Sequence, residues 1–148
     1  MADATIVEPA EILAPYARVT TAPLDRAAVE AAVLTQADGA LVVFEGIIRN
    51  HDDGKGVQGI EYRAHPDAEE FLRSVCAAVS AESGLPTAAA HRYGELAVGD
   101  VALIAAVAAP HRAEAFAACQ RLVEEIKART PIWKRQHLSD GTSQWVGL

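Results

Sequence analysis

A nearly unbroken apolar segment at residues 40–48 places the strongest constraint on the fold. Its sequence, A-L-V-V-F-E-G-I-I, is rich in β-branched side chains and predicts a strand that is covered on both faces. Glu45 and Gly46 interrupt the apolar run, and a glycine inside a strand indicates a bulge or the close approach of another backbone. The 148 residues of the chain are enough to cover such a strand within one domain.

The rest of the chain interleaves helical and extended patterns. Apolar residues recur at helical spacing in three segments, which predicts helices over residues 26–35, 66–83 and 113–129. We expect Asp25 to cap the first helix, Gly84 to close the second and Pro131 to stop the third. Further strands are predicted at residues 18–22, 57–64, 88–93, 101–109, 132–136 and 144–146, with a turn-rich connection at residues 94–100.

The order of these elements decides between fold classes. Strands and helices are interspersed without a regular β-α-β repeat, and hairpin connections recur, so we predict an α+β fold with a mixed or antiparallel sheet and packed helices. We expect Phe71 and Phe116 to lie on the buried faces of their helices. Residues 1–17, rich in alanine, proline and glutamate, are predicted to be a flexible N-terminal arm, and residues 18–148 a single domain.

Cysteine and charge patterns restrict the compartment and the partners. Cys76 and Cys119 lie in apolar helical segments without C-x-x-C spacing, which predicts buried free thiols in a reducing compartment. The net charge of −7 argues against general affinity for nucleic acid or anionic lipid. Residues 101–148 nevertheless carry six basic and four acidic groups, which indicates one local anion site on an acidic body. Because we find neither a signal peptide nor an apolar run of ~20 residues, we expect a cytoplasmic protein.

Two of the three lysines lie seven residues apart. Lys127 and Lys134 stand on either side of Pro131, whereas the chain has ten arginines for its other cationic positions. Lysine offers a compact ammonium with a tunable pKa, whereas arginine offers a fixed planar fork. The pair is therefore a candidate reactive site. The alternative is that Lys127 only complements the C-terminal dipole of its helix and Lys134 lies on a solvated strand face.

Further cations stand at the ends of predicted elements. Arg49 follows the apolar strand, His111 and Arg112 precede the third helix, and Arg135 adjoins Lys134. An arginine beside a helix N-terminus can hold a phosphate with charge-assisted hydrogen bonds. Each cation taken alone is explained as well by a surface charge. The sequence has no P-loop, nucleophile elbow or H-E-x-x-H motif, which leaves the lysines as the best candidates for reactive groups.

Several of these segments also resemble a known family. They are G-A-L-V-V-F-E-G-I-I-R-N-H at 39–51, H-R-Y-G-E-L-A-V-G-D at 91–100, P-H-R at 110–112, K-A-R-T-P-I-W-K at 127–134 and D-G-T-S-Q-W-V at 140–146. Their order over residues 36–146 resembles the large, catalytic subunit of molybdopterin synthase. The resemblance implies an α+β, hammerhead-like fold with a small β subdomain. It departs near the C-terminus, where family members often continue with basic residues but Gln144 and Trp145 here are followed by none.

This resemblance implies a sulfurtransferase of molybdenum cofactor biosynthesis. Such an enzyme converts cyclic pyranopterin monophosphate, precursor Z, into the dithiolene of molybdopterin. The sulfur comes from the C-terminal Gly-Gly thiocarboxylate of a small ubiquitin-like subunit, and a homodimer of large subunits forms the centre of a heterotetramer. The resemblance implies neither a cofactor nor a metal for this step.

The resemblance also implies roles for individual residues. Lys127 is similar to the catalytic lysine, and Lys134 to its partner in handling thiocarboxylate and substrate. Arg49, His111, Arg112 and Arg135 are expected to bind substrate, with His111 and Arg112 supplied across the dimer, and Phe44 is expected to line the channel for the partner's tail. The alternative is a non-catalytic module that binds a ubiquitin-like tail or a phosphorylated ligand.

Overall fold

The computed structural model describes residues 15–146. Its helices are α2 (Arg26–Ala31), α3 (Ala68–Ser83) and α4 (Arg112–Arg129). Its strands are β1 (Ala17–Thr20), β2 (Ala40–Ile47), β3 (His51–Asp52), β4 (Lys55–Ala64), β5 (Thr87–Arg92), β6 (Gly94–Ala97), β7 (Val101–Ala109), β8 (Ile132–Leu138) and β9 (Ser143–Val146). These elements confirm the predicted α+β class. The predicted N-terminal arm lies mostly outside the described residues, and its last residue, Ala17, already begins β1.

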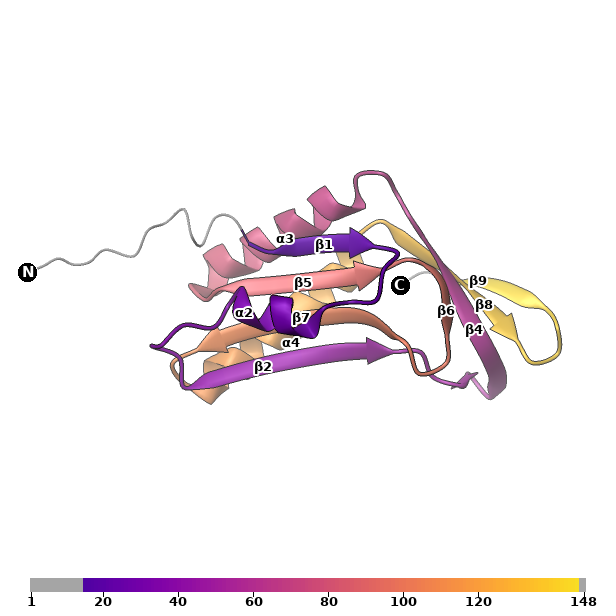
Figure 1. The fold of residues 1–148 in the computed structure, drawn as a ribbon, viewed down its shortest axis with the longest axis horizontal. Coiled ribbons are helices and arrows are strands. Elements are labelled where there is room, and N and C mark those ends of the chain that lie inside the picture. Colours follow the sequence, from indigo (N-terminus) through magenta and orange to yellow (C-terminus); the bar gives the residue numbers. More distant parts are fainter. Residues whose placement is uncertain (1–14, 147–148) are drawn as a thin grey trace, which may run out of the picture.

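The first sheet has four strands in the order β1-β5-β7-β2 and carries helices on both faces (Figure 1). Alternate residues of β7 point to opposite sides: Leu103, Ala105 and Val107 pack in the core beneath α3 and α4, whereas Ile104 and Ala106 pack in the core beneath α2. The many alanines of β5 and β7 let the helices approach the sheet closely. This sheet therefore separates two buried cores, one on each of its faces.

Local sequence signals set the helix ends. The Asp25 carboxylate accepts a hydrogen bond from the Ala28 amide at 3.1 Å, as a helix N-cap does. The first helix is shorter than predicted because Asp38 accepts hydrogen bonds from both the amide and the hydroxyl of Thr35, which closes a turn. Gly84, with a φ of 74°, ends α3 in the left-handed conformation. Pro131 follows the extended Thr130 and ends α4 as predicted.

The second sheet has the order β3-β4-β8-β9, and β6 also pairs with β4. It lies at one end of the first sheet (Figure 1) and confirms the predicted small β subdomain, after which it is called the small sheet. β3 and β4 are joined by Asp53 and Gly54, whose φ values of 50° and 77° give a two-residue hairpin turn. β6 was predicted only as a turn-rich connection, because its four residues are too few to show a clear alternation.

Three predictions about burial are wrong. Every residue of β2 is only half-buried or exposed, because among the described strands β7 alone pairs with β2, at one edge of the sheet. Phe71 and Phe116 are 49% and 61% exposed. They lie beside the buried stripes of their helices, which centre on residues such as Leu72 and Leu122. The bulge predicted at Gly46 is present as a register shift against β7.

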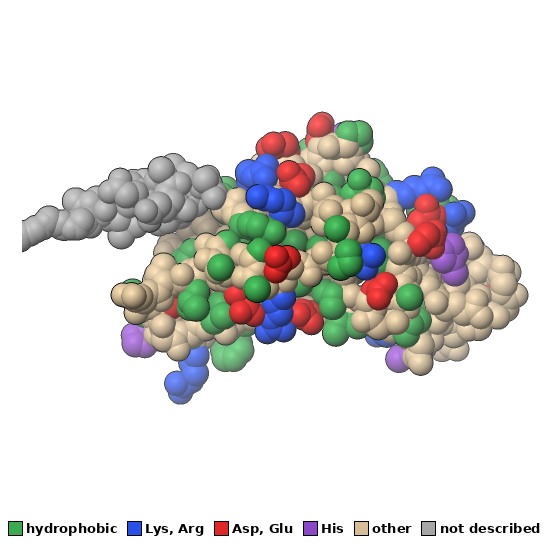
Figure 2. Space-filling view, viewed as in Figure 1, with side chains coloured by type: hydrophobic (Ala, Val, Ile, Leu, Met, Phe, Trp, Pro, Cys, Tyr) green, Lys and Arg blue, Asp and Glu red, His purple; other side chains and the backbone are tan. Residues whose placement is uncertain are grey.

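The two cysteines agree with the sequence-based prediction. Cys76 and Cys119 are free and buried, and burial raises the pKa of the Cys76 thiol to about 12. Within residues 15–146, no helix has the length and apolarity needed to cross a membrane. On the face shown in Figure 2, acidic and basic side chains are interspersed with apolar ones over α2 and β1. This face therefore carries no large patch of a single charge over α2 and β1.

Candidate functional site

A cavity of about 320 Å³ lies where the two sheets meet. The end of β2 and its following loop contribute Phe44 and Arg49, the last turn of α4 contributes Lys127, and the inner face of the small sheet contributes Lys134 and Gln136. A volume of this size is sufficient for a small-molecule ligand. The two lysines predicted to act together therefore line one cavity.

The break at Pro131 brings the two lysines together. α4 ends at Arg129, the chain turns, and β8 begins at Ile132. Side chains alternate along β8, so Lys134 and Gln136 face the cavity whereas Trp133 lies on the outer face, 49% exposed. The end of α4 and the alternation of side chains along β8 therefore direct Lys127 and Lys134 into the same cavity.

Lys134 is the lysine whose ionisation the site perturbs. Its pKa is lowered, first by burial and then by repulsion from Lys127 and Arg49, while the carboxylate of Asp52 opposes the shift. An ammonium in this position loses its proton more easily than one in water. Lys127 is more exposed, at the rim of the cavity. The pair thus places two cations in one cavity, and the lowered pKa of Lys134 suits it to exchanging protons.

Asp52 connects the cations to the small sheet. One carboxylate oxygen accepts a hydrogen bond from Arg49 at 3.1 Å, and the other accepts one from the Gln136 amide at 2.8 Å. The Gln136 bond is the main cause of the lowered pKa of Asp52, and Arg49 and Lys134 add to it. Asp52 and Gln136 were not predicted as site residues, because their contact joins segments 84 positions apart in the sequence.

His91 and Tyr62 form a buried aromatic pair that also lines the cavity. Their ring centroids are 5.1 Å apart in an edge-to-face arrangement. Burial raises the pKa of Tyr62 to about 12. Burial is also the main cause that lowers the pKa of His91 to about 4, and the charge of Lys127 contributes. His91 belongs to a segment that carried the family resemblance, but no role for it was predicted from the sequence.

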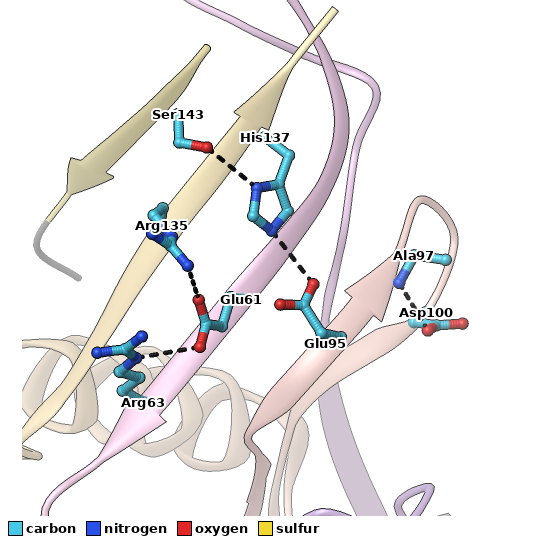
Figure 3. A network of polar contacts seen from close by, with 8 residues as sticks. All are labelled: Glu61, Arg63, Glu95, Ala97, Asp100, Arg135, His137 and Ser143. Atoms are coloured by element: carbon cyan, nitrogen blue, oxygen red, sulfur yellow. Dashed lines mark hydrogen bonds and ion pairs between the residues drawn. The ribbon is translucent and has the colours of Figure 1, made fainter. Parts of the chain in front are cut away.

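Arg135 points away from the cavity. Its guanidinium donates to Glu61 at 2.6 Å, and Glu61 also accepts from Arg63 at 3.0 Å (Figure 3). Both guanidinium groups lie over the ring of Trp145, at 5.1 and 5.0 Å. Arg135 therefore belongs to a network on the outer face of the small sheet, and its predicted role in substrate binding stays a prediction.

The same outer network contains three possible metal ligands. Glu61, Glu95 and His137 place their ligand atoms within 4.8 Å of one another. However, each carboxylate oxygen of Glu61 already accepts a hydrogen bond from an arginine, and His137 contacts Glu95 at 3.2 Å. Two guanidinium groups beside Glu61 also repel a cation. These contacts explain the cluster as an ion-pair network, while the cations of the cavity favour an anionic ligand.

His111 and Arg112 lie far from the cavity within one chain. They stand at the N-terminus of α4, and the rise of 1.5 Å per helical residue places Arg112 about 22 Å from Lys127 along the helix. They are exposed and do not line the cavity. The structure thus brings together Phe44, Arg49 and the two lysines, but not the His111 and Arg112 pair.

Comparison with known proteins identifies the family. A family model described as MoaE protein matches residues 19–129. The chain belongs to the MoaE family. Among relatives of this MoaE chain, the molybdopterin synthase catalytic subunit 1 of Mycobacterium tuberculosis is 39% identical over 137 residues, which cover 90% of this chain and 91% of that protein.

Solved structures have the same fold as this MoaE chain. The X-ray crystal structure of molybdopterin synthase from Staphylococcus aureus matches with a TM-score of 0.82 and 31% identity, covering 89% of this chain and 97% of that chain. A chain from the complex of subunits 1 and 2 of molybdopterin-converting factor from Helicobacter pylori matches with a TM-score of 0.63 and 18% identity, which shows the shared fold. The family membership inferred from the sequence is confirmed.

Proposed function

We propose that this MoaE chain is the catalytic subunit of a molybdopterin synthase and that the cavity is its sulfur-transfer site. Sulfur passes from the C-terminal thiocarboxylate of a small ubiquitin-like subunit to cyclic pyranopterin monophosphate, which becomes the dithiolene of molybdopterin. The observation that carries this proposal is the convergence of Lys127, Lys134 and Arg49 on one cavity. The rest of the chain is acidic, with a net charge of −7 overall.

The charges of the two reactants explain the need for these cations. A thiocarboxylate and a phosphate ester are both anions, so bringing them together requires local positive charge to offset their repulsion. Lys127 and Lys134 supply that charge. Because its pKa is lowered, Lys134 is also suited to move protons as sulfur replaces oxygen on the substrate. In this proposal Lys127 is the central catalytic lysine and Lys134 its partner.

The other cavity residues take binding roles. Arg49, held by Asp52 at 3.1 Å, presents its guanidinium to the phosphate of the substrate. Phe44 lines the cavity from β2 and contacts the extended C-terminal tail of the small subunit as the tail enters. We place the complex in the cytoplasm, where the buried thiols of Cys76 and Cys119 remain reduced.

A homodimer would bring His111 and Arg112 to the cavity. Ala40, at the start of β2, pairs with Ala109, so His111 lies near that end of the strand while Arg49 follows the other end. β2 is an edge strand among the described residues. A two-fold antiparallel pairing of β2 with its copy would exchange these ends, so that each chain offers His111 and Arg112 to the cavity of its partner.

Reconstitution tests the proposed function. The purified chain is mixed with a thiocarboxylated small subunit and precursor Z, and the product is oxidised to its fluorescent pterin derivative. We expect Lys127→Ala to abolish product while still forming a complex with the small subunit on a sizing column. Lys55→Ala is the matched control, because Lys55 is exposed on the β3-β4 hairpin and does not line the cavity. A stable wild-type complex without product would favour the non-catalytic binding module instead.

A further inference from the structure

His91 is a buried polar group of the cavity to which the proposed mechanism gives no role. It lies on β5 and is only 3% exposed. Its Nδ1 lies 2.8 Å from the carbonyl oxygen of Arg92. A carbonyl oxygen can only accept, so Nδ1 carries the proton and donates it. In the neutral ring, Nε2 therefore holds an unshared electron pair.

The Nε2 atom is open to the cavity. No residue of the described chain donates a hydrogen bond to it. In residues 15–146, two buried side-chain atoms are fully enclosed and have no hydrogen-bond partner, namely Thr130 Oγ1 and Arg135 Nε. His91 Nε2 is not one of these two atoms, so it is not fully enclosed. Because His91 lines the cavity, the space that its free nitrogen reaches is the cavity itself.

The environment holds the ring in one state and one orientation. Burial and the charge of Lys127 both lower the pKa of His91, to about 4, which keeps the imidazole neutral near pH 7. The edge-to-face contact with Tyr62 fixes the plane of the ring. Tyr62 in turn pairs directly with Lys134 across β4 and β8. The acceptor is thus held in place by the same strands that position the lysine.

Of the side-chain acceptors that line this cavity, Nε2 of His91 belongs to the most deeply buried residue, at 3% exposed. In their charged forms, Lys127, Lys134 and Arg49 only donate hydrogen bonds. The two oxygens of Asp52 are each already engaged, with Arg49 and with Gln136. A ligand that carried only negative charge would use the cations and leave the nitrogen of His91 unpaired in a buried site, which is unfavourable.

We propose that His91 binds the substrate through Nε2, which accepts a hydrogen bond from an N–H or O–H group next to the anionic part held by the lysines. The ligand class is a heterocycle that carries both an anionic substituent and ring N–H donors. This inference rests on the proposed function, because a pyranopterin monophosphate has both features. It assigns His91 a specificity role that separates such a substrate from a simple anion.

Nitrogen NMR of the full-length chain tests this role directly. Histidine is labelled with ¹⁵N, and the His91 signals are assigned by comparison with His91→Gln. Without ligand, we expect the pattern of a neutral ring protonated at Nδ1. Saturation with precursor Z should shift the Nε2 signal upfield, as happens when this nitrogen accepts a hydrogen bond, whereas saturation with sulfate, which has no donor, should not. The proposal would be overturned if the Nε2 signal did not shift when precursor Z binds, or if it shifted equally with sulfate.

Two variants supply the second measurement. His91→Phe keeps an aromatic ring against Tyr62 but removes the acceptor, and we expect it to bind precursor Z roughly tenfold more weakly while binding sulfate as the wild type does. His91→Gln retains an acceptor at similar reach and should recover part of that loss. Equal affinities for precursor Z in His91→Phe and the wild type would refute the role of His91. If one variant fails to fold, as judged by thermal unfolding, the other variant supplies the signal assignment and the wild-type NMR result decides.

The two hypotheses fail in different ways. If the wild type transfers no sulfur but its Nε2 signal shifts with precursor Z, the proposed catalytic function fails and the acceptor role stands. If sulfur transfer proceeds and the His91→Phe variant keeps the wild-type KM for precursor Z, the acceptor role fails and the catalytic function stands.

Discussion

Lys134 and Arg135 are consecutive residues of β8 whose side chains leave the strand on opposite faces. Lys134 lines the cavity, where burial and neighbouring cations lower its pKa. Arg135 donates to Glu61 at 2.6 Å on the outer face, above the ring of Trp145. The two cations that the sequence places side by side therefore meet different partners, and their substitution should have different consequences.

We predict that Lys134→Ala lowers the rate of sulfur transfer by about 100-fold, because it removes a charge that faces both anionic reactants. Its melting temperature should stay close to that of the wild type, since the ammonium is partly buried among other cations. Arg135→Ala should instead keep the rate within about threefold but lower the free energy of unfolding, because Glu61 loses a charge-assisted hydrogen bond. Product assays and urea unfolding check both.

The two variants also test the substrate-binding role that the sequence predicted for Arg135. If Arg135→Ala raised the KM for precursor Z tenfold and left the unfolding free energy unchanged, the sequence-based role would be right and the structural interpretation wrong.

The predictable part of the fold is encoded in local signals. The helical spacing of apolar residues, the cap at Asp25 and the left-handed Gly84 define helices within the chain without reference to other elements. Lys127 and Lys134 were found because two of the three lysines of the chain lie within one short segment, on either side of Pro131. The exposure of Phe116 could not be predicted, because a residue at the edge of a helical stripe is buried only if a neighbouring element covers it.

The unpredicted part of the site depends on contacts between distant segments. Asp52 meets Gln136 across 84 positions of the sequence, and His91 meets the ring of Tyr62 from the other sheet. Within its own segment, Asp52 looks like an ordinary residue of a polar hairpin, and His91 looks like an ordinary residue of a mostly alanine strand. Their chemistry appears only when the two sheets are placed against each other.

We predict that Asp52→Asn shifts the pH profile of sulfur transfer toward lower pH. The carboxylate of Asp52 raises the pKa of Lys134 against the effects of burial and repulsion, so removing its charge must lower that pKa further. The limb of the kcat/KM profile that reports Lys134 should move in the same direction. Asp53→Asn removes the same charge from the neighbouring turn residue, which does not line the cavity, and serves as the matched control.

An unchanged profile in Asp52→Asn would show that Lys134 does not control the pH dependence. An equal shift in Asp53→Asn would attribute the effect to the overall charge of the loop and not to the contact between Asp52 and the cavity.

We predict that His91 makes the protein sensitive to acid. A histidine whose pKa is lowered from 6.5 to about 4 in the folded state contributes stability that is complete above pH 6.5 and is lost as the pH falls to 4, since the unfolded state binds the proton first. Over this pH range, the contribution of His91 to the free energy of unfolding falls by about 3 kcal/mol at most. Urea unfolding at pH 7, 5.5 and 4 measures it, with His91→Gln as the reference.

The carboxylates that also titrate in this range, Asp52 among them, are present in both proteins and cancel in the difference between them. Parallel stability curves for the wild type and His91→Gln between pH 7 and 4 would mean that the folded state protonates His91 freely, in conflict with its burial.

We predict that an inactive Lys127→Ala chain and an Arg112→Ala chain restore activity to each other when they are refolded together. If Arg112 acts in the cavity of the partner, a mixed dimer has one site that lacks both side chains and one site that has both. Random mixing puts half of the chains into mixed dimers, so about a quarter of the wild-type activity should return. If Arg112 acts within its own chain, the mixed dimer has one defect in each site and gains nothing. The product assay on the separate and the co-refolded chains decides between these arrangements. As a control, Lys55→Ala is refolded with Arg112→Ala, which shows the activity expected when one chain of the mixed dimer is fully competent.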